Sequence, residues 1–256
     1  MRVAGLQHDI MWEEPLATCA HVTPMIAEAV DSGADMVLLT EMFATGFSLA
    51  AERIAEPPGG PTEAFLADQA VEHGVWMGGS IPTLDPAIGD GRPVNRFLLV
   101  GPDGTRHAYD KLHPFSFADE HLAYAAGDRT MTLVIDGVRF SLFTCYDLRF
   151  ADAFWGLAHD TDAYLVVANW PESRRHHWRT LLRARAIENQ AWVVGVNRVG
   201  EGNGLAYSGD TVIVDPLGEA VAEGIDHTEG VVLADVDPVV VTDVRDRFRF
   251  LPDRRS

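Results

Sequence analysis

The sequence alternates short apolar runs with longer stretches of helical periodicity, and this alternation limits the possible folds more than any other feature. Buried strands are predicted from apolar runs over residues 2–9, 34–41 and 75–82. Amphipathic helices are predicted between them, over residues 14–33 and 60–74. The second helix has Pro61 at its start and Gly74 at its end, an arrangement that is common in helices. Strands that alternate with helices indicate an α/β fold.

The later part of the chain contains hairpins, which change the kind of sheet that is possible. Residues 95–111 are typical of two strands around the turn "GPDG", and residues 133–143 of two strands that turn at Asp136 and Gly137. Further strands are predicted within residues 162–169, 192–200, 207–224 and 230–237, and further helices over residues 174–191 and 237–250, with a frayed tail over residues 251–256. Hairpins between β-α units exclude a purely parallel, doubly wound sheet, so we expect mixed sheets covered by helices.

Composition limits the domain organisation and the partners. The 256 residues are 47% hydrophobic, and no linker, low-complexity tract or repeat divides them, so residues 1–256 are expected to form one domain. The formal net charge of −18 argues against nucleic acid as a partner, because a phosphate polymer would be repelled. It also argues against docking on anionic membranes, and no apolar run approaches transmembrane length. In so acidic a protein, a small anionic substrate would need a local basic pocket.

The cysteines and the first residues bear on the compartment. Cys19 and Cys145 fit no disulfide framework or zinc pattern, so both are expected to be reduced. The first ten residues contain no apolar stretch or cleavage pattern of a secretion signal. These features predict a cytoplasmic protein.

Cys145 is the first candidate for chemistry. It follows the apolar run "VRFSLF" and precedes the helical-looking stretch "LRFADAFWGLAHD", which places it where a strand turns into a helix. The N–H groups and positive dipole end of a helix N-terminus are expected to lower the pKa of a thiol and to hold an oxyanion. The alternative is a buried structural cysteine, which is the commoner fate of a free cysteine. Cys19 lies in the middle of an amphipathic helix and is expected to belong to the core.

A nucleophilic thiol needs a base, and two charged residues at predicted strand ends are candidates for the rest of a site. Glu41 ends an apolar strand, where burial would raise its pKa and make it a general base, although it is equally an ordinary loop carboxylate. Lys111 follows a hairpin strand and is either solvated or part of a site at the strand ends. Together with Cys145 these residues would supply a base, an oxyanion stabiliser and a nucleophile for acyl transfer.

Other conspicuous residues give weaker signals. No histidine can be paired with Cys145 from the sequence, and His176 and His177 point about 100° apart on a helix, unlike a same-face metal pair. The cluster "RRHHWR" at residues 174–179 is expected to begin a helix that balances local acid or frames the mouth of a pocket. The run "GEGNG" at residues 200–204 lacks the spacing of a dinucleotide-binding loop and is expected to be a flexible turn.

Three motifs, "LLTEMFATGF", "YDKLHPF…ADEHLAYAAG" and "FTCYDLRF", resemble in order and spacing the Glu, Lys and Cys motifs of the nitrilase superfamily of carbon–nitrogen hydrolases. The runs "VVANWP", "RARAIENQAWVVGVNRVG" and "YSGDTVIVDPLGE" extend the resemblance over nearly the whole chain. The resemblance implies a four-layer α-β-β-α sandwich with two mixed sheets. It also implies a homodimer that pairs through one face of the sandwich, and neither a metal nor an organic cofactor.

The resemblance also implies roles for individual residues in the hydrolysis of an amide or nitrile through a thioester. Cys145 would be the nucleophile, Glu41 the general base and Lys111 the stabiliser of the tetrahedral oxyanion. The backbone N–H of Tyr146 would complete the oxyanion hole. Glu120 matches the family's second glutamate, which supports the lysine and the attacking water; its alternative is a solvated helix charge.

The run from "CYDLRF" to "NRVG" most resembles the omega-amidase branch, whose substrates are omega-amides of 2-oxo acids such as 2-oxoglutaramate. Such a substrate carries a carboxylate, which Arg149, one helical turn after Cys145, would grip bidentately unless Asp147 or Asp152 pairs with it. Phe47 and Trp170, with Phe43, would line an apolar wall or belong to the core. The alternatives are another amidase or N-carbamoyl hydrolase of the superfamily, acting on deaminated glutathione or an N-carbamoyl amino acid, a nitrilase, or an inactive relative.

Overall fold

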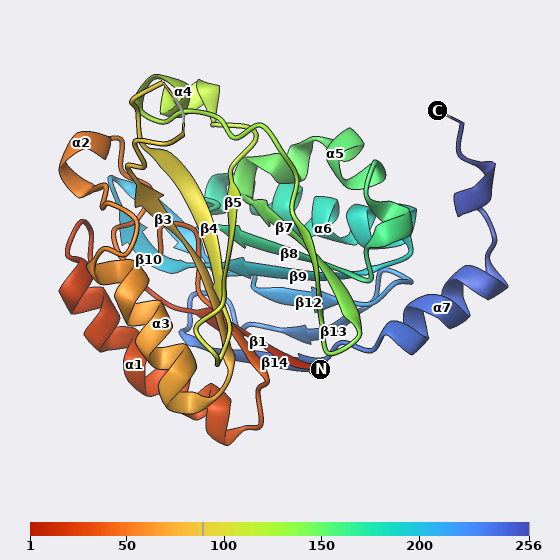
Figure 1. The fold of residues 1–256 in the computed structure, drawn as a ribbon. Helices are drawn as coiled ribbons and strands as arrows, with labels where there is room; N and C mark the ends of the chain where they lie inside the picture. Colours follow the sequence, from red (N-terminus) through yellow and green to blue (C-terminus); the bar gives the residue numbers. More distant parts are fainter. Residues whose placement is uncertain (89, 256) are drawn as a thin grey trace.

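Two mixed β-sheets lie face to face in the computed structural model, which describes residues 1–88 and 90–255 (Figure 1). The strands of the first sheet are β1 (Arg2–Gln7), β2 (Met36–Leu38), β3 (Trp76–Thr83), β4 (Val94–Val100), β5 (Arg106–Asp110) and β14 (Gly230–Asp235). Their order is β14-β1-β2-β3-β4-β5. The pairs β1–β2 and β2–β3 are parallel and the others are antiparallel, so this sheet is mixed as expected.

The second sheet repeats this plan. Its strands are β6 (Thr132–Ile135), β7 (Val138–Thr144), β8 (Ala163–Ala168), β9 (Trp192–Asn197), β12 (Val212–Val214) and β13 (Ala220–Glu223). Their order is β13-β12-β9-β8-β7-β6, with parallel pairs β7–β8 and β8–β9 and antiparallel pairs at the edges. A separate antiparallel hairpin joins β10 (Val199–Gly202) and β11 (Leu205–Ser208).

Helices cover the outer face of each sheet. The α-helices are α1 (Pro15–Asp31), α2 (Ala51–Ile54), α3 (Pro61–His73), α4 (Glu120–Ala123), α5 (Ala151–Trp155), α6 (Arg175–Asn189) and α7 (Pro238–Arg247). Short 3-10 turns are η1 (Ser116–Ala118), η2 (Cys145–Arg149), η3 (Ala158–Asp160), η4 (Glu172–Arg174) and η5 (Leu251–Asp253). Helices α1 and α3 pack on the first sheet and α6 packs on β9, with α5 beside it (Figure 1). The predicted four-layer α-β-β-α sandwich is thereby confirmed.

Side-chain alternation along the strands separates two apolar cores. In β4, Phe97 and Leu99 belong to the central core between the sheets, whereas Leu98 and Val100 belong to the core under α1 and α3. This alternation follows from the strand period of two, which sends successive side chains to opposite faces. Gly195 in β9 lets α6 approach closely, since a Cβ there would lie 2.5 Å from a methyl group of Leu182.

Several local predictions were wrong. Strand β2 ends at Leu38, so Glu41 lies in a turn beyond the strand end. The helix expected after Cys145 is broken into η2 and α5, because Phe150 between them is extended with φ −100° and ψ 90°. The run "GEGNG" forms the predicted turn only at Asn203 and Gly204, both at positive φ, because residues 200–202 belong to strand β10.

Residues 251–254 of the tail pack against the rest of the protein rather than fraying. Leu251 is buried, and the Arg254 guanidinium lies 3.4 Å from the centroid of the Trp155 ring and donates to Asn189 Oδ1 at 2.9 Å. Ser256, the last residue of the predicted frayed tail, lies outside the described residues. Over residues 1–88 and 90–255, no helix combines the length and the apolar character needed to cross a membrane.

Candidate active site

Four predicted site residues converge at one end of the seam between the two sheets. Glu41 follows β2 and Lys111 follows β5, both in the first sheet, whereas Cys145 follows β7 in the second sheet. Glu120 begins α4 in the loop that continues from Lys111. Strands from both sheets therefore end near one another and bring together side chains that are far apart in the sequence.

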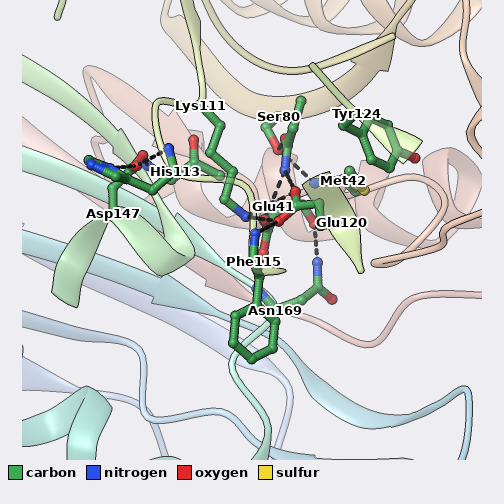
Figure 2. Close-up of polar contacts among 12 residues, drawn as sticks. Glu41, Met42, Ser80, Lys111, His113, Phe115, Glu120, Tyr124, Asp147 and Asn169 are labelled. Atoms are coloured by element: carbon green, nitrogen blue, oxygen red, sulfur yellow. Dashed lines mark hydrogen bonds and ion pairs between the residues drawn. The ribbon is translucent and has the colours of Figure 1, made fainter. Parts of the chain in front are cut away.

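Lys111 contacts both of the buried glutamates in the site. Its Nζ lies 2.8 Å from Glu41 Oε1 and 2.8 Å from Glu120 Oε2, and all three side chains are 0% exposed (Figure 2). Burial alone lowers the pKa of a lysine, but the charges of Glu120 and Glu41 outweigh it and hold the pKa of Lys111 well above its usual value. Glu120 is therefore not a solvated helix charge, and burial raises the pKa of its carboxyl against the opposing effect of Lys111.

Two asparagines fix the Glu41 carboxylate. Asn95 Nδ2 donates to Glu41 Oε1 at 2.8 Å, and the backbone N–H of Asn169 donates to Glu41 Oε2 at 2.9 Å. Ser80 Oγ in turn donates to Asn95 Oδ1 at 2.7 Å. These supporting residues were not predicted from the sequence. The rule applied to Glu41, that a polar side chain at the end of an apolar strand needs a partner, would have found Asn169 after β8, whereas Asn95 lies near the start of β4.

Cys145 sits on a strained turn. Its φ is +47°, in the left-handed region that non-glycine residues rarely adopt, and residues in such conformations cluster at functional sites. Met42, next to Glu41, and Asp119, next to Glu120, also have positive φ, at 40° and 61°. The thiol and both glutamates of the site thus lie at or next to an unusual backbone conformation.

The expectation that the thiol pKa is lowered was wrong. Burial raises the pKa of Cys145 well above its usual value, and the Glu41 carboxylate raises it further by its charge and as a hydrogen-bond acceptor. Lys111 acts in the opposite direction but does not offset these two effects. The short 3-10 turn η2 replaces the expected helix N-terminus, so a long helix dipole does not act on the sulfur. The resting thiol is therefore protonated at neutral pH.

Asp147 joins the cysteine turn to the lysine loop. Its carboxylate is fully buried and accepts hydrogen bonds from the Tyr109 hydroxyl at 2.7 Å and the Thr144 N–H at 3.0 Å. The backbone N–H and ring Nδ1 of His113 lie 3.0 and 2.8 Å from its other oxygen. Tyr109 and His113 lie two residues before and after Lys111, so one carboxylate positions both segments.

The predicted substrate-binding residues line a pocket above the thiol. About 480 Å³ of space, including its open mouth, is bounded in part by Cys145 with Phe47, Tyr146, Arg149 and Trp170. The Arg149 guanidinium lies 4.8 Å from the Trp170 ring centroid. Among the described residues it makes no ion pair, and Asp147 is occupied by the bonds given above.

One predicted wall residue does not belong to the pocket. Phe43 is fully buried and packs against Phe65, in the core under α1 and α3. Of the arginine cluster, Arg174 reaches the pocket, whereas Arg175 pairs with Asp210 and Asp226. Both expectations for that cluster, balancing local acid and framing the pocket, thus hold for different members.

The arrangement contains the groups that acyl transfer needs. A protonated thiol lies beside a fixed carboxylate, and a buried ammonium reaches the same pocket. These groups can supply a nucleophile, a proton acceptor and a positive charge for a developing oxyanion. In the part of the chain that the structure describes, no three His, Cys, Asp or Glu side chains are grouped to hold a metal ion.

Known proteins share both the sequence and the fold. Residues 2–246 match the family described as carbon-nitrogen hydrolase. The chain is 38% identical to omega-amidase YafV of Escherichia coli (strain K12) over 252 residues, which cover 97% of this chain and 94% of that protein. It is 33% identical to 2-oxoglutaramate amidase of Bacillus subtilis (strain 168) over 261 residues, which cover 99% of this chain and 97% of that protein.

A solved structure agrees closely with the architecture. The crystal structure of XC1258 from Xanthomonas campestris, a CN-hydrolase superfamily protein with an arsenic adduct in the active site, superposes with a TM-score of 0.92. The two chains are 37% identical, and the match covers 100% of this chain and 97% of that one.

Proposed function

Because this chain belongs to the carbon-nitrogen hydrolase family, we propose that it hydrolyses the terminal amide of an omega-amide of a 2-oxo acid, such as 2-oxoglutaramate, and releases ammonia. Family membership makes the chain a hydrolase of carbon–nitrogen bonds. The narrower substrate is supported by relatives named omega-amidase and 2-oxoglutaramate amidase, which align along nearly the whole chain. The observation that carries the proposal is the convergence of Glu41, Lys111 and Cys145 on a pocket whose outer part holds Arg149.

The first half of the reaction is acylation of the thiol. Glu41 takes the proton of Cys145 as the sulfur attacks the amide carbon, and the carbonyl electrons move onto oxygen. The Lys111 ammonium and the Tyr146 backbone N–H stabilise this oxyanion. Glu41 then gives its proton to the amide nitrogen, the C–N bond breaks and ammonia leaves a thioester on Cys145. Because the resting thiol is protonated, proton transfer to Glu41 accompanies the attack.

The second half is hydrolysis of the thioester. Glu41 takes a proton from a water molecule, whose oxygen attacks the thioester carbon. The C–S bond breaks, the sulfur regains a proton from Glu41 and the carboxylic acid product leaves. Glu120 holds Lys111 in place through both halves, since its carboxylate binds the ammonium from a second side. Fixed donors and acceptors of this kind need no reorganisation during the reaction.

Recognition of the substrate carboxylate falls to Arg149. Its guanidinium stacks on Trp170 and donates to His177 Nδ1 at 3.2 Å, which leaves further N–H groups for a carboxylate. Phe47 and Trp170 would contact the methylene carbons between the carboxylate and the amide. This division suits a short, linear molecule with an amide at one end and an anion at the other.

The test is ammonia release by the purified protein. We expect turnover of 2-oxoglutaramate at a higher kcat/KM than of deaminated glutathione, an N-carbamoyl amino acid or a simple nitrile. A Cys145→Ala variant should lose this activity while keeping its fold. If 2-oxoglutaramate is inert and another of these compounds is hydrolysed, the substrate proposal is wrong. If none is hydrolysed and Cys145→Ala changes nothing, the chain is an inactive relative.

Assembly and location are also proposed. We propose a single domain, a homodimer that pairs through one face of the sandwich, and a cytoplasmic location. The side chains of Trp155 on α5 and Ile187 on α6 are exposed apolar groups on one outer layer, which supports pairing through that layer. Free Cys19 and Cys145 suit a reducing compartment. Light scattering on the eluting protein would give the molar mass, and a monomer would contradict the dimer.

A further inference from the structure

The walls of the pocket are cationic without an accompanying acid. Its lining includes Lys111, Arg149 and Arg174 but no Asp or Glu side chain among the described residues. Lys111 is neutralised from behind by Glu41 and Glu120, so the two arginines carry the uncompensated charge. In a chain with a net charge of −18, this concentration of positive charge points to an anionic or electron-rich ligand.

Arg174 is free to bind such a ligand. It ends the turn η4 at the rim of the pocket, and its guanidinium lies 5.4 Å from the Phe115 ring centroid. Within residues 1–88 and 90–255 that guanidinium has neither an ion pair nor a hydrogen bond, whereas neighbouring Arg175 is bound by Asp210 and Asp226. An arginine stacked on an aromatic ring keeps its N–H edges available for oxygen acceptors.

Tyr207 offers a second unpaired donor to the same pocket. Only 2% of this residue is exposed, and the described residues provide no hydrogen-bond partner for its hydroxyl. Burial raises the pKa of Tyr207 to about 12, so the hydroxyl keeps its proton at neutral pH. Arg198 packs against its ring, with the guanidinium 4.5 Å from the ring centroid, and holds the ring in place. A hydroxyl that lines a pocket and makes no bond within the protein can donate to a ligand or to water.

The two arginines lie on neighbouring aromatic rings. Arg149 lies over Tyr146, whose ring centroid is 4.7 Å from that of Phe115, the ring under Arg174. In a 2-oxo acid the carboxylate and the oxo group are on adjacent carbons. A carboxylate held by Arg149 therefore brings the next carbon toward the part of the pocket lined by Arg174 and Tyr207.

We propose that Arg174 and Tyr207 form a subsite that reads the substituent on carbon 2 of the substrate, an inference that rests on the proposed function. Both side chains donate hydrogen bonds, so they match an oxo oxygen, which only accepts them. An ammonium group at the same carbon would meet donors and a like charge, with no lining carboxylate to pair with it. The subsite thus accepts 2-oxo amides and rejects glutamine, which has the same amide and carboxylate.

Three substrates that differ only in the substituent on carbon 2 test the subsite. 2-Oxoglutaramate carries an oxo group at carbon 2, glutaramate carries only hydrogen there, and glutamine carries an ammonium. We expect Arg174→Gln to lower kcat/KM for 2-oxoglutaramate about 10- to 100-fold, as for loss of a hydrogen bond from a charged donor, and for glutaramate about 3-fold or less. Tyr207→Phe should lower the first value about 3- to 10-fold. The ratio of kcat/KM for 2-oxoglutaramate to kcat/KM for glutamine should be smaller in Arg174→Gln than in the native protein.

Arg179→Gln is the matched control. Arg179 lies on α6 outside the pocket lining and is half-exposed, so its removal should leave all three values within about 2-fold. A binding measurement separates recognition from chemistry. Calorimetry with Cys145→Ala protein should show tighter binding of 2-oxoglutarate than of glutarate, and the added Arg174→Gln change should remove the difference.

The outcomes distinguish this inference from the proposed function. If the native protein does not hydrolyse 2-oxoglutaramate, the proposed function has failed and the subsite fails with it. If 2-oxoglutaramate is hydrolysed but Arg174→Gln lowers kcat/KM equally for it and for glutaramate, Arg174 attracts anions in general and the subsite is wrong. Unchanged kinetics and unchanged 2-oxoglutarate binding in Arg174→Gln would also overturn it.

Discussion

The Tyr109 hydroxyl donates a 2.7 Å hydrogen bond to Asp147, and this bond crosses from the first sheet to the second. Tyr109 lies in β5, two residues before the proposed oxyanion stabiliser, and Asp147 lies two residues after the proposed nucleophile. His113 reaches the other Asp147 oxygen from beyond the lysine. The relative position of amine and sulfur therefore depends on a carboxylate that touches neither.

Replacing Asp147 by asparagine should separate positioning from chemistry. The amide NH₂ would face two donors in place of one carboxylate oxygen, so we expect about 2–4 kcal/mol less stability toward urea, from lost hydrogen bonds to a buried charge. The kcat should fall while the KM changes little, because the recognition residues are untouched. Asp152→Asn, at an exposed position on α5, is the control and should match the native protein. Equal stability of the two variants would contradict the role of Asp147.

The buried triad of charges predicts stability effects of different size for its members. Lys111→Met leaves Glu41 and Glu120 buried without their shared cation, and we expect a loss of about 3–5 kcal/mol in the free energy of unfolding. Glu41→Gln keeps a one-to-one pair of Lys111 and Glu120 but places its NH₂ group against the Asn169 N–H, so the loss should be smaller, about 1–2 kcal/mol. Both variants should lose at least about 100-fold in kcat. If urea unfolding shows that Glu41→Gln is less stable than Lys111→Met, this account of the buried charges is wrong.

The thiol chemistry gives a third prediction. Because the charge of Glu41 raises the pKa of Cys145, Glu41→Gln should shift the pH profile of Cys145 alkylation by iodoacetamide to lower pH. The variant would then be alkylated faster at mildly alkaline pH although its turnover is lost. Peptide mass spectrometry measures the alkylation of both cysteines in the same sample. Cys19, whose pKa burial raises to about 12, is the internal control and should react slowly in both proteins. An unchanged Cys145 profile would show that Glu41 does not control the thiol.

The buried side chain of His8 is expected to make the free energy of unfolding depend on pH. Burial lowers the pKa of His8 to about 4, and its Nε2 lies 3.2 Å from the hydroxyl of Thr40, the neighbour of Glu41. Between about pH 6.5 and 4 the unfolded chain binds this proton and the folded chain does not, so stability falls as the pH falls through that window. The change from pH 7 to pH 5 should be about 2 kcal/mol.

Urea unfolding at pH 7 and pH 5 tests that prediction. His8→Gln should remove about 2 kcal/mol of the pH-dependent loss, whereas His159→Gln, at an exposed position, should keep it. The same pH dependence in the native protein and in His8→Gln would assign the loss to other groups.

The strands, the helices and the mixed character of the sheets were predicted well from the sequence because strand and helix periods are local properties, whereas the four-layer arrangement was implied by the motif resemblance. The hairpin around "GPDG" and the Asp136–Gly137 turn follow from neighbouring residues, and the structure confirms both. The length of the helix after Cys145 was wrong, because its break at Phe150 depends on packing of that ring on His113 at 3.8 Å. Tertiary contacts of this kind leave no local pattern.

The candidate site shows the same limit. Their places at predicted strand ends, and then the motif resemblance, selected Glu41, Lys111 and Cys145, but the sign of the thiol pKa shift depends on burial and on the carboxylate beside the sulfur. Asn95 was missed because its role depends on pairing across β3 and β4 with Ser80. Arg174 was visible only as one charge in a basic cluster, since the ring beneath it comes from a loop about sixty residues earlier.

The division of the reactive groups between two sheets has a consequence for biogenesis. A chain in which either half has formed alone holds an amine without a sulfur, or a sulfur without a proton acceptor. Newly made or partly unfolded molecules are therefore inert toward amides. The rate of ammonia release measures only those molecules in which the two sheets have packed together. During refolding, recovery of turnover should lag behind recovery of secondary structure by the time that docking takes.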